Sequence, residues 1–266
     1  MARPPQTLSA PSLIVQHRGL LTVALMLSTI MQALDTTIAN VALPDMQATL
    51  GAAQNQITWV LTSYIVAAAI ATPLTGWLSD RIGQKRLFII GVVGFTAASM
   101  LCGFAMNLEQ IIIFRIVQGL FGAVLAPLAQ TVLLDINPRE RYGQATALYG
   151  ASIMAAPIVG PTLGGYLTEV LDWRWVFFVN LPVGVATVVL LSAFMPGIPV
   201  KRRRFDFFGF GMLALAVGAT QLLIERGTEA GWFSSAEIWI YLGLAVAGAW
   251  AFIVHSATAE NPIIDL

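Results

Sequence analysis

Eight apolar stretches, each long enough to cross a bilayer, follow one another along the chain with short connections between them. About 20 residues at a rise of roughly 1.5 Å per residue span a hydrocarbon core of about 30 Å as an α-helix. The pattern therefore predicts an all-α transmembrane protein. Its eight spans are expected near residues 20–42, 57–78, 87–106, 109–134, 142–168, 175–195, 207–224 and 237–255.

An aspartate, Asp35, lies in the body of the first stretch. An aspartate inside a membrane helix costs roughly 3 kcal/mol, so it normally has a partner, water or a proton. At about 100° per residue, the face that carries Asp35 is otherwise lined by small and polar residues, namely Ser28, Thr29, Gln32, Thr36, Ala39 and Asn40. The hydroxyl groups alone indicate a helix-packing seam, whereas the carboxylate favours a functional site. We expect Gln32, Thr36 and Asn40 to line a cavity.

A second charge, Arg115, lies inside the fourth stretch. Asp35 and Arg115 each lie about seven residues from the outer end of their predicted spans, which places both at a depth of about 10 Å. The two side chains are therefore expected to meet, and each would lower the other's desolvation cost. Two interpretations remain open: a switch in which protonation of Asp35 releases Arg115, and a static structural ion pair. Gln118 is a further cavity-lining candidate.

Two prolines four residues apart, Pro157 and Pro161, mark the fifth stretch. Each removes a backbone donor and frees the carbonyl four residues earlier, so this span is expected to bend or break in its outer half. Gly160 and Gly164 form a small-xxx-small face beside the bend, and Gly165 follows directly. Such a face permits close contact with a neighbouring helix.

The connection between the second and third stretches is short and rich in charge. Its simplest interpretation is a tight turn that fixes the topology. An acid at the end of one helix and cations before the next also suit bonds between helices that latch a cytoplasmic gate. The candidate gate residues are Gly76, Asp80, Arg81, Gly83, Lys85 and Arg86.

The distribution of charge predicts how the chain sits in the membrane. Only 11% of residues are charged and 57% are hydrophobic, against roughly 25% and 45–50% in soluble domains. Lys and Arg are enriched in cytoplasmic connections. A cytoplasmic N-terminus leaves only Arg174 and Arg226 in outer connections and places the others inside, namely Arg3, Arg18, Arg81, Lys85, Arg86, Arg139, Arg141 and residues 201–204. Residues 201–204 are either an orientation anchor or a lipid-headgroup site.

Together these motifs resemble those of the major facilitator superfamily, and the whole chain resembles its fourteen-span drug:proton antiporters of the EmrB/QacA type. The connection 76–86 resembles the superfamily's signature loop, residues 115–119 its intramembrane Arg-x-x-Gln-Gly motif, and residues 160–165 its antiporter motif. Residues 34–44 and 173–182 resemble signatures of the fourteen-span branch.

The resemblance implies a fold and a division of the chain. The fold would be an N-terminal six-helix bundle of two inverted three-helix repeats, followed by two additional transmembrane helices. The expected parts are a cytoplasmic tail (1–19), the bundle (20–198), a basic cytoplasmic linker (199–206), and the extra helices with the start of a C-terminal half (207–266). Family members continue with a second six-helix bundle, so we expect a fragment or truncation rather than a half that assembles with another copy.

The resemblance also implies roles for individual residues. Asp35 would be the protonation site and Arg115 its modulator. Asp80 and Arg81 would be gate residues, and Gly160 with Pro161 would form the hinge of the export motif.

The sequence thus predicts proton-coupled efflux of amphipathic drugs or toxic organic compounds across the cytoplasmic (inner) membrane. It contains no P-loop, no Cys-x-x-Cys pair and no metal-ligand spacing, so we expect no metal, no cofactor, no enzymatic activity and a proton gradient as the energy source. The alternatives are an exporter for one metabolite, such as an antibiotic or siderophore, and a non-transporting membrane subunit. Expected partners are the lipid bilayer, amphipathic small molecules, protons, the C-terminal half and a periplasmic adaptor, but no nucleic acid.

Overall fold

The computed structural model describes residues 13, 15–197, 200 and 205–259, and most of these residues are helical. The first three spans comprise α1 (Arg18–Leu50), α2 (Gln54–Ile57), α3 (Trp59–Ala71), α4 (Leu74–Ile82) and α5 (Gln84–Gly103). The next three comprise α6 (Leu108–Gly122), α7 (Leu125–Asp135), α8 (Tyr142–Val170), α9 (Trp175–Phe178) and α10 (Asn180–Phe194). The last two are α11 (Phe207–Gly227) and α12 (Ala236–Thr258).

The eight predicted spans are confirmed in number and order. Within the described residues, seven helical segments are long and apolar enough to cross a membrane, and the bent pair α3 and α4 supplies an eighth. The basic linker residues 201–204 and the tail residues 1–12 lie outside the described residues.

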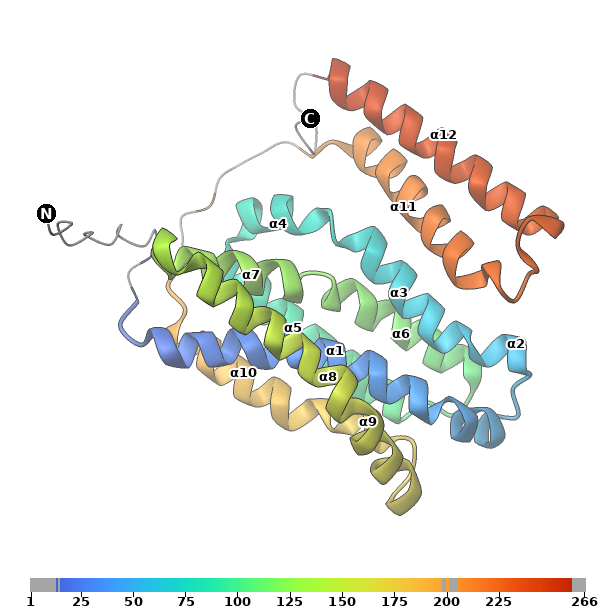
Figure 1. Cartoon of the computed structure of the whole chain (residues 1–266), viewed down its shortest axis with the longest axis horizontal. Coiled ribbons are helices and arrows are strands. Elements are labelled where there is room, and N and C mark those ends of the chain that lie inside the picture. Colours follow the sequence, from blue (N-terminus) through green and yellow to red (C-terminus); the bar gives the residue numbers. More distant parts are fainter. Residues whose placement is uncertain (1–12, 14, 198–199, 201–204, 260–266) are drawn as a thin grey trace, which may run out of the picture.

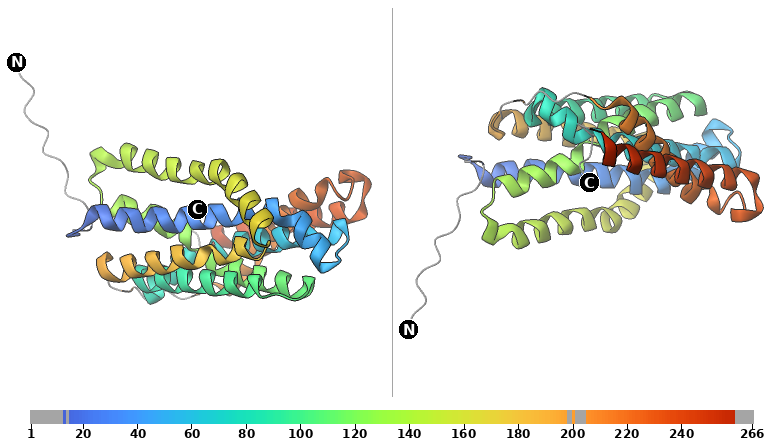
Figure 2. Two further views of the ribbon diagram at one scale, coloured as in Figure 1. Left: turned by 90° about the horizontal axis from the view of Figure 1, so that it is seen from below. Right: turned by 90° about the horizontal axis from the view of Figure 1, so that it is seen from above.

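Helix α1 occupies the centre of the bundle (Figures 1 and 2), where it contacts α8 on one side and α10 and α7 on others. Helix α6 packs between α3 and α5, and α5 also contacts α10. The α11–α12 hairpin lies beside α3 at the edge of the bundle. These contacts bring α1 and α6, the two helices that carry intramembrane charges, to the same interior.

Two apolar clusters fill the bundle. One contains Met31 and the other contains Ile38, so Asp35 lies between them along α1. Because each cluster is built of buried aliphatic and aromatic side chains, the polar groups between them are shielded from both ends.

The second and fourth spans are each interrupted for two residues where no interruption was predicted. Helices α3 and α4 meet at an angle of 59° around Thr72 and Pro73. Helix α6 ends at Gly122, and α7 begins at Leu125, two residues before Pro127. Proline donates no backbone hydrogen bond and clashes with the preceding turn, which accounts for both positions.

The first span is longer than predicted. Helix α1 continues through Pro44 to Leu50 rather than ending near residue 42. Met46, in this extra segment, is fully buried in the second apolar cluster, so packing offsets the donor lost at Pro44. The helix ends at Gly51, whose φ of 63° lies in the left-handed region that favours glycine.

The fifth span, expected to bend or break, bends without breaking. Helix α8 is one helix with Pro157 and Pro161 inside it, and its second half curves away from the direction of its first half (Figure 2). Gly160 and Gly164 lie on the face that packs against α1.

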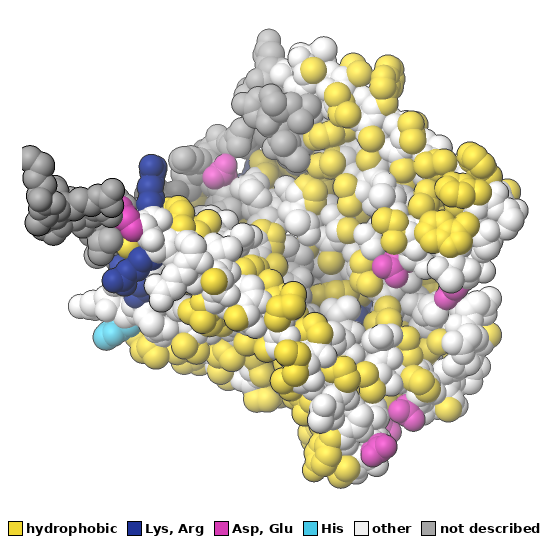
Figure 3. All heavy atoms as spheres, in the orientation of Figure 1, with side chains coloured by type: hydrophobic (Ala, Val, Ile, Leu, Met, Phe, Trp, Pro, Cys, Tyr) yellow, Lys and Arg dark blue, Asp and Glu magenta, His cyan; other side chains and the backbone are white. Residues whose placement is uncertain are grey.

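Basic side chains gather at one end of the described structure (Figure 3). The helix termini there carry Arg18, Arg81, Lys85, Arg86, Arg139 and Arg141. Arg174 and Arg226 lie at the opposite end. This asymmetry follows the pattern that positions cytoplasmic connections of membrane proteins.

Candidate functional site

Asp35 and Arg115 meet in the interior of the bundle, as the depth estimate predicted. Arg115 Nη1 donates to Asp35 Oδ2, and both side chains are fully buried. Two amides complete the shell of the carboxylate: Gln118 Nε2 and Asn180 Nδ2 donate to Asp35 Oδ1 over 2.7 Å and 2.9 Å. The carboxylate therefore receives hydrogen bonds from α6 and α10 while it projects from α1.

Arg115 has partners besides Asp35. Its Nε donates to the carbonyl of Val60 over 3.0 Å, and its Nη1 also donates to Gln118 Oε1 over 2.9 Å. Its guanidinium carbon lies 4.2 Å from the centre of the Tyr64 ring, a cation–π distance. Helix α6 approaches α3 closely because residue 119 is glycine: a Cβ there would lie 2.5 Å from the carbonyl oxygen of Tyr64.

Asn180 and Ser99 belong to the site, and the sequence analysis did not identify either. Asn180 Nδ2 donates to Ser99 Oγ as well as to Asp35, and Ser99 donates to the carbonyl of Phe177, each bond to Ser99 being 2.9 Å long. The sequence did contain a signal that could have identified Asn180. Asn180 lies five residues inside the outer end of an apolar span, about 8 Å deep and near the depth estimated for Asp35.

The bonding around Asp35 suits an ionised carboxylate. Three N–H donors stabilise the ionised carboxylate, and Arg115 balances its charge. Protonation of Asp35 removes the attraction to Arg115, whereas the guanidinium keeps the Val60 carbonyl, the Gln118 oxygen and the Tyr64 ring. Arg115 is therefore bonded to the backbone of α3 and to Gln118 as well as to Asp35.

The predicted cavity residues divide into two groups. Thr36 is half-buried, Asn40 is exposed, and Gln32 is half-buried and donates to the carbonyl of Gly122 over 3.1 Å. Gln118, by contrast, is fully buried against Asp35 and does not line an open surface. Because Gln118 bonds both members of the ion pair, it belongs to the charge network rather than to a cavity wall.

The predicted gate residues lie on adjoining helix ends. Gly76, Asp80 and Arg81 are in α4, Gly83 separates the helices, and Lys85 and Arg86 begin α5. Lys85 Nζ donates to the carbonyl of Ser192 in α10 over 2.8 Å, and the Arg81 guanidinium carbon lies 5.1 Å from the centre of the Trp77 ring. The segment is thus a tight turn and also bonds to another helix.

Two of the predicted hinge residues, Gly160 and Gly164, contact α1 close to Asp35. A Cβ on Gly160 would collide with Thr37 Oγ1, and a Cβ on Gly164 would lie 3.3 Å from Ile38 and Val41 side-chain atoms. Thr37 of α1 also donates to the carbonyl of Ala156 over 3.4 Å. Gly165 faces open space. The glycine face of α8 therefore rests on the turn of α1 that follows Asp35.

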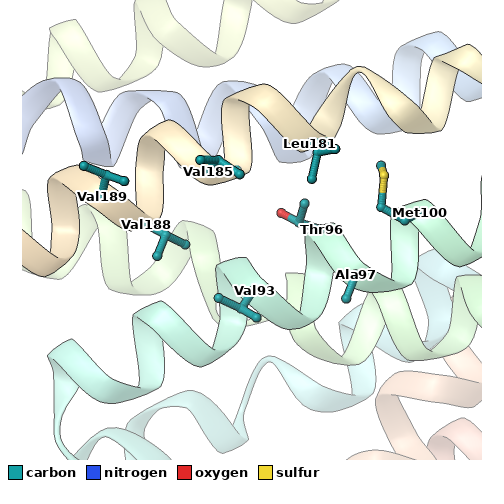
Figure 4. Close-up of a pocket in the computed structure, with 9 residues that line it drawn as sticks. Val93, Thr96, Ala97, Met100, Leu181, Val185, Val188 and Val189 are labelled. Carbon is teal, nitrogen blue, oxygen red and sulfur yellow. The ribbon is translucent and has the colours of Figure 1, made fainter.

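An apolar groove of about 320 Å³ borders the site between α5 and α10 (Figure 4). Thr96 is its one residue with a polar side chain; the others are Val93, Ala97, Met100, Leu181, Gly184, Val185, Val188 and Val189. Thr96 lies one turn from Ser99, and Gly184 lies one turn from Asn180. None of the lining residues is charged. The groove therefore contains no side chain of the charge network, although it lies next to Ser99 and Asn180 along α5 and α10.

The described residues contain no group of three or more His, Cys, Asp or Glu side chains arranged to hold a metal ion.

Comparisons with known proteins place this geometry in a family. Residues 25–261 match the family model described as Major Facilitator Superfamily. The chain is 43% identical to Multidrug export protein EmrB of Escherichia coli (strain K12) over 249 residues, which is 93% of this chain and 49% of the relative. It is 41% identical to Fatty acid resistance protein FarB of Neisseria gonorrhoeae over 253 residues, which is 92% of this chain and 49% of the relative. The chain thus spans about half the length of these curated relatives.

Solved structures show the same fold at low sequence identity. A peptide transporter, POT, in complex with sulfate matches 95% of this chain and 55% of its own, with a TM-score of 0.67 and 16% identity. The human organic anion transporter MFSD10 (TETRAN) matches 97% of this chain and 72% of its own, with a TM-score of 0.61 and 13% identity. On the family match and the shared fold, this chain belongs to the major facilitator superfamily.

Proposed function

We propose that the chain forms the N-terminal half of a transporter that exports amphipathic organic compounds in exchange for protons across the cytoplasmic membrane. One observation carries the proposal: a fully buried carboxylate, Asp35, paired with a single buried guanidinium and two amides. Intramembrane ionisable pairs of this kind are typical of proton relays. The names of the relatives, which refer to multidrug export and fatty acid resistance, support an amphipathic substrate.

The exchange would proceed through the charge state of Asp35. A proton from the outside would neutralise Asp35, release Arg115 and favour the inward-facing state. Substrate would enter from the cytoplasm or the inner leaflet, and its binding would favour loss of the proton. A membrane potential would help to drive the inward movement of the proton, since moving one charge across 100 mV is worth about 2.3 kcal/mol.

The other predicted residues take supporting roles in this proposal. Lys85, held on the carbonyl of Ser192, together with Asp80 and Arg81, would close the cytoplasmic side. Gly160 and Pro161 would let α8 move against α1. Thr36, which is half-buried, and Asn40, which is exposed, would face substrate. The N-terminus would be cytoplasmic, because the basic helix ends lie on its side.

Uptake of a fluorescent amphipathic dye into energised inside-out vesicles, which corresponds to export from the cell, tests the proposal in the full-length protein. We expect Asp35→Asn to reduce dye uptake at least tenfold, because a neutral side chain cannot alternate between two charge states. Asp45→Asn is a matched control, since Asp45 is an exposed acid on the same helix. Uptake by Asp35→Asn at the level of the parent would show that Asp35 does not couple transport to protons.

A further inference from the structure

We infer that Asn180 is a positioning residue that directs the transported proton to Oδ2 of Asp35, the oxygen bonded to Arg115. A proton on Oδ2 would then share the oxygen that Arg115 contacts and weaken that bond directly, which couples the proton to the conformational switch. The inference deepens the proposed function and rests on it.

The two oxygens of Asp35 have different surroundings. Oδ1 accepts from Gln118 Nε2 at 2.7 Å and from Asn180 Nδ2 at 2.9 Å, while Arg115 Nη1 donates to Oδ2. Each carboxylate oxygen has about two lone-pair sites. Both sites of Oδ1 are therefore occupied by amide hydrogens, and a proton placed there would have to displace one of them.

Asn180 is fixed in the orientation that this role requires. Its Nδ2 uses both hydrogens, one on Asp35 and one on Ser99 Oγ at 2.9 Å. Ser99 in turn donates to the carbonyl of Phe177, so its oxygen is left to accept from Asn180. Turning the amide over would set its oxygen against the Asp35 carboxylate, where two acceptors repel each other.

The groups around Oδ2 allow a proton to replace the Arg115 guanidinium as the partner of this oxygen. Three titratable or charged groups face Asp35 from neighbouring helices: Arg115 of α6, Tyr64 of α3 and Cys102 of α5. Arg115 is the cation among them, and it keeps the Val60 carbonyl and the Gln118 oxygen when Asp35 becomes neutral. Without Asn180, Oδ1 would have a free lone pair and could take a proton while Oδ2 still held Arg115.

Infrared difference spectroscopy of the reconstituted full-length transporter, between acidic and alkaline buffer, tests the assignment at the level of the atom. The parent should show a protonated-carboxyl C=O band that is lost in Asp35→Asn. In Asn180→Leu, which has a similar volume and no N–H, we expect the band to shift, because the proton moves to Oδ1 and the carbonyl oxygen changes from Oδ1, with its two amide donors, to Oδ2, which Arg115 contacts. A monodisperse size-exclusion profile of each variant establishes that it is folded.

Dye efflux and proton flux provide the second readout. We expect Asn180→Leu to export several-fold less dye per proton than the parent and to have a shifted pH profile, and Ser99→Ala to show a smaller change in the same direction. An unshifted C=O band and an unchanged dye-to-proton ratio in Asn180→Leu would overturn the role of Asn180. If Asp35→Asn kept both the band and the efflux, the proposed function itself would fail.

Discussion

At the scale of single residues, Asp35 and Arg115 depend on each other. Both are fully buried, so each supplies the charge that makes the other tolerable. Removing one partner of a buried pair costs about 3–5 kcal/mol, because the remaining charge is left uncompensated, whereas removing both is often nearly neutral. The pair alone is therefore weak support for stability, and its burial inside a bundle of membrane-spanning helices favours the proposed functional role.

Arg115→Gln should destabilise the full-length protein by about 3 kcal/mol in alkaline buffer. The loss should shrink in acidic buffer, because a protonated Asp35 no longer needs the cation. The double variant Asp35→Asn/Arg115→Gln should recover most of the stability and should lose the pH dependence. The free energy of unfolding is measured for all three proteins in mixed micelles. Equal stability of the single and double variants at every pH would contradict this account.

Gly83 makes the turn between α4 and α5 possible. Its φ of 90° and ψ of 141° belong to a region that residues with a Cβ avoid, at a cost of about 1–3 kcal/mol. We expect Gly83→Ala to lower thermal stability and to weaken the Lys85 contact with α10. Gly76→Ala is the control, because Gly76 is helical and a Cβ there meets nothing within 4 Å. The prediction fails if the two variants melt alike.

At the scale of helices, the contact between α8 and α1 depends on two glycines spaced four apart. Gly160 leaves room for Thr37, and Gly164 leaves room for Ile38 and Val41. This contact lies one turn beyond Asp35 on α1, so a movement of α8 would be transmitted to the segment that carries the proton site.

Gly160→Ala should therefore reduce both stability and efflux, since the added Cβ collides with Thr37 Oγ1. Thr37→Ala should restore part of the loss when it is combined with Gly160→Ala. Gly165→Ala provides the matched control on the same helix, because its Cβ would face open space. Fluorescence-detected size-exclusion after heating measures the folded fraction. Full tolerance of Gly160→Ala would mean that the two helices are not tightly packed there.

The sequence predicted the helices more completely than their interruptions. Long apolar stretches made the spans clear. The similar depths of Asp35 and Arg115 in their spans correctly predicted that the two side chains meet. The break near Pro73 was missed, and the predicted end of the first span near residue 42 was wrong because α1 continues through Pro44. The effect of a proline depends on packing that periodicity does not reveal. Asn180 was missed because a single amide in an apolar span resembles a packing residue until its partners are seen.

At the scale of the whole molecule, the distribution of charge favours the proposed orientation with a cytoplasmic N-terminus. Among the residues that the structure describes, most Lys and Arg side chains gather at the end of the bundle where α1 begins (Figure 3). The loop between α11 and α12 lies at the other end (Figure 1). The hairpin is joined at both ends: Arg226 Nε donates to Glu237 over 2.6 Å, and His255 Nε2 lies 2.9 Å from Asp206 Oδ1. The hairpin therefore forms a unit whose outer loop can report the orientation of the chain.

Cysteine labelling in intact cells should confirm this orientation. Cys102 is buried, so Cys102→Ala provides a background for single new cysteines. An impermeant maleimide should label Thr228→Cys in the outer loop of intact cells, and it should label Gln144→Cys only after permeabilisation. Both positions are exposed, so access rather than burial decides the result. The reverse pattern would contradict the positive-inside orientation.

The central claim is that Asp35 carries the proton that is exchanged for substrate. Proton release on substrate binding, followed with a pH indicator in weakly buffered solution of the purified full-length protein, measures this directly. The parent should release protons as an amphipathic dye binds, Asp45→Asn should behave in the same way, and Asp35→Asn should bind dye without releasing a proton. Release by Asp35→Asn equal to that of the parent would contradict the account.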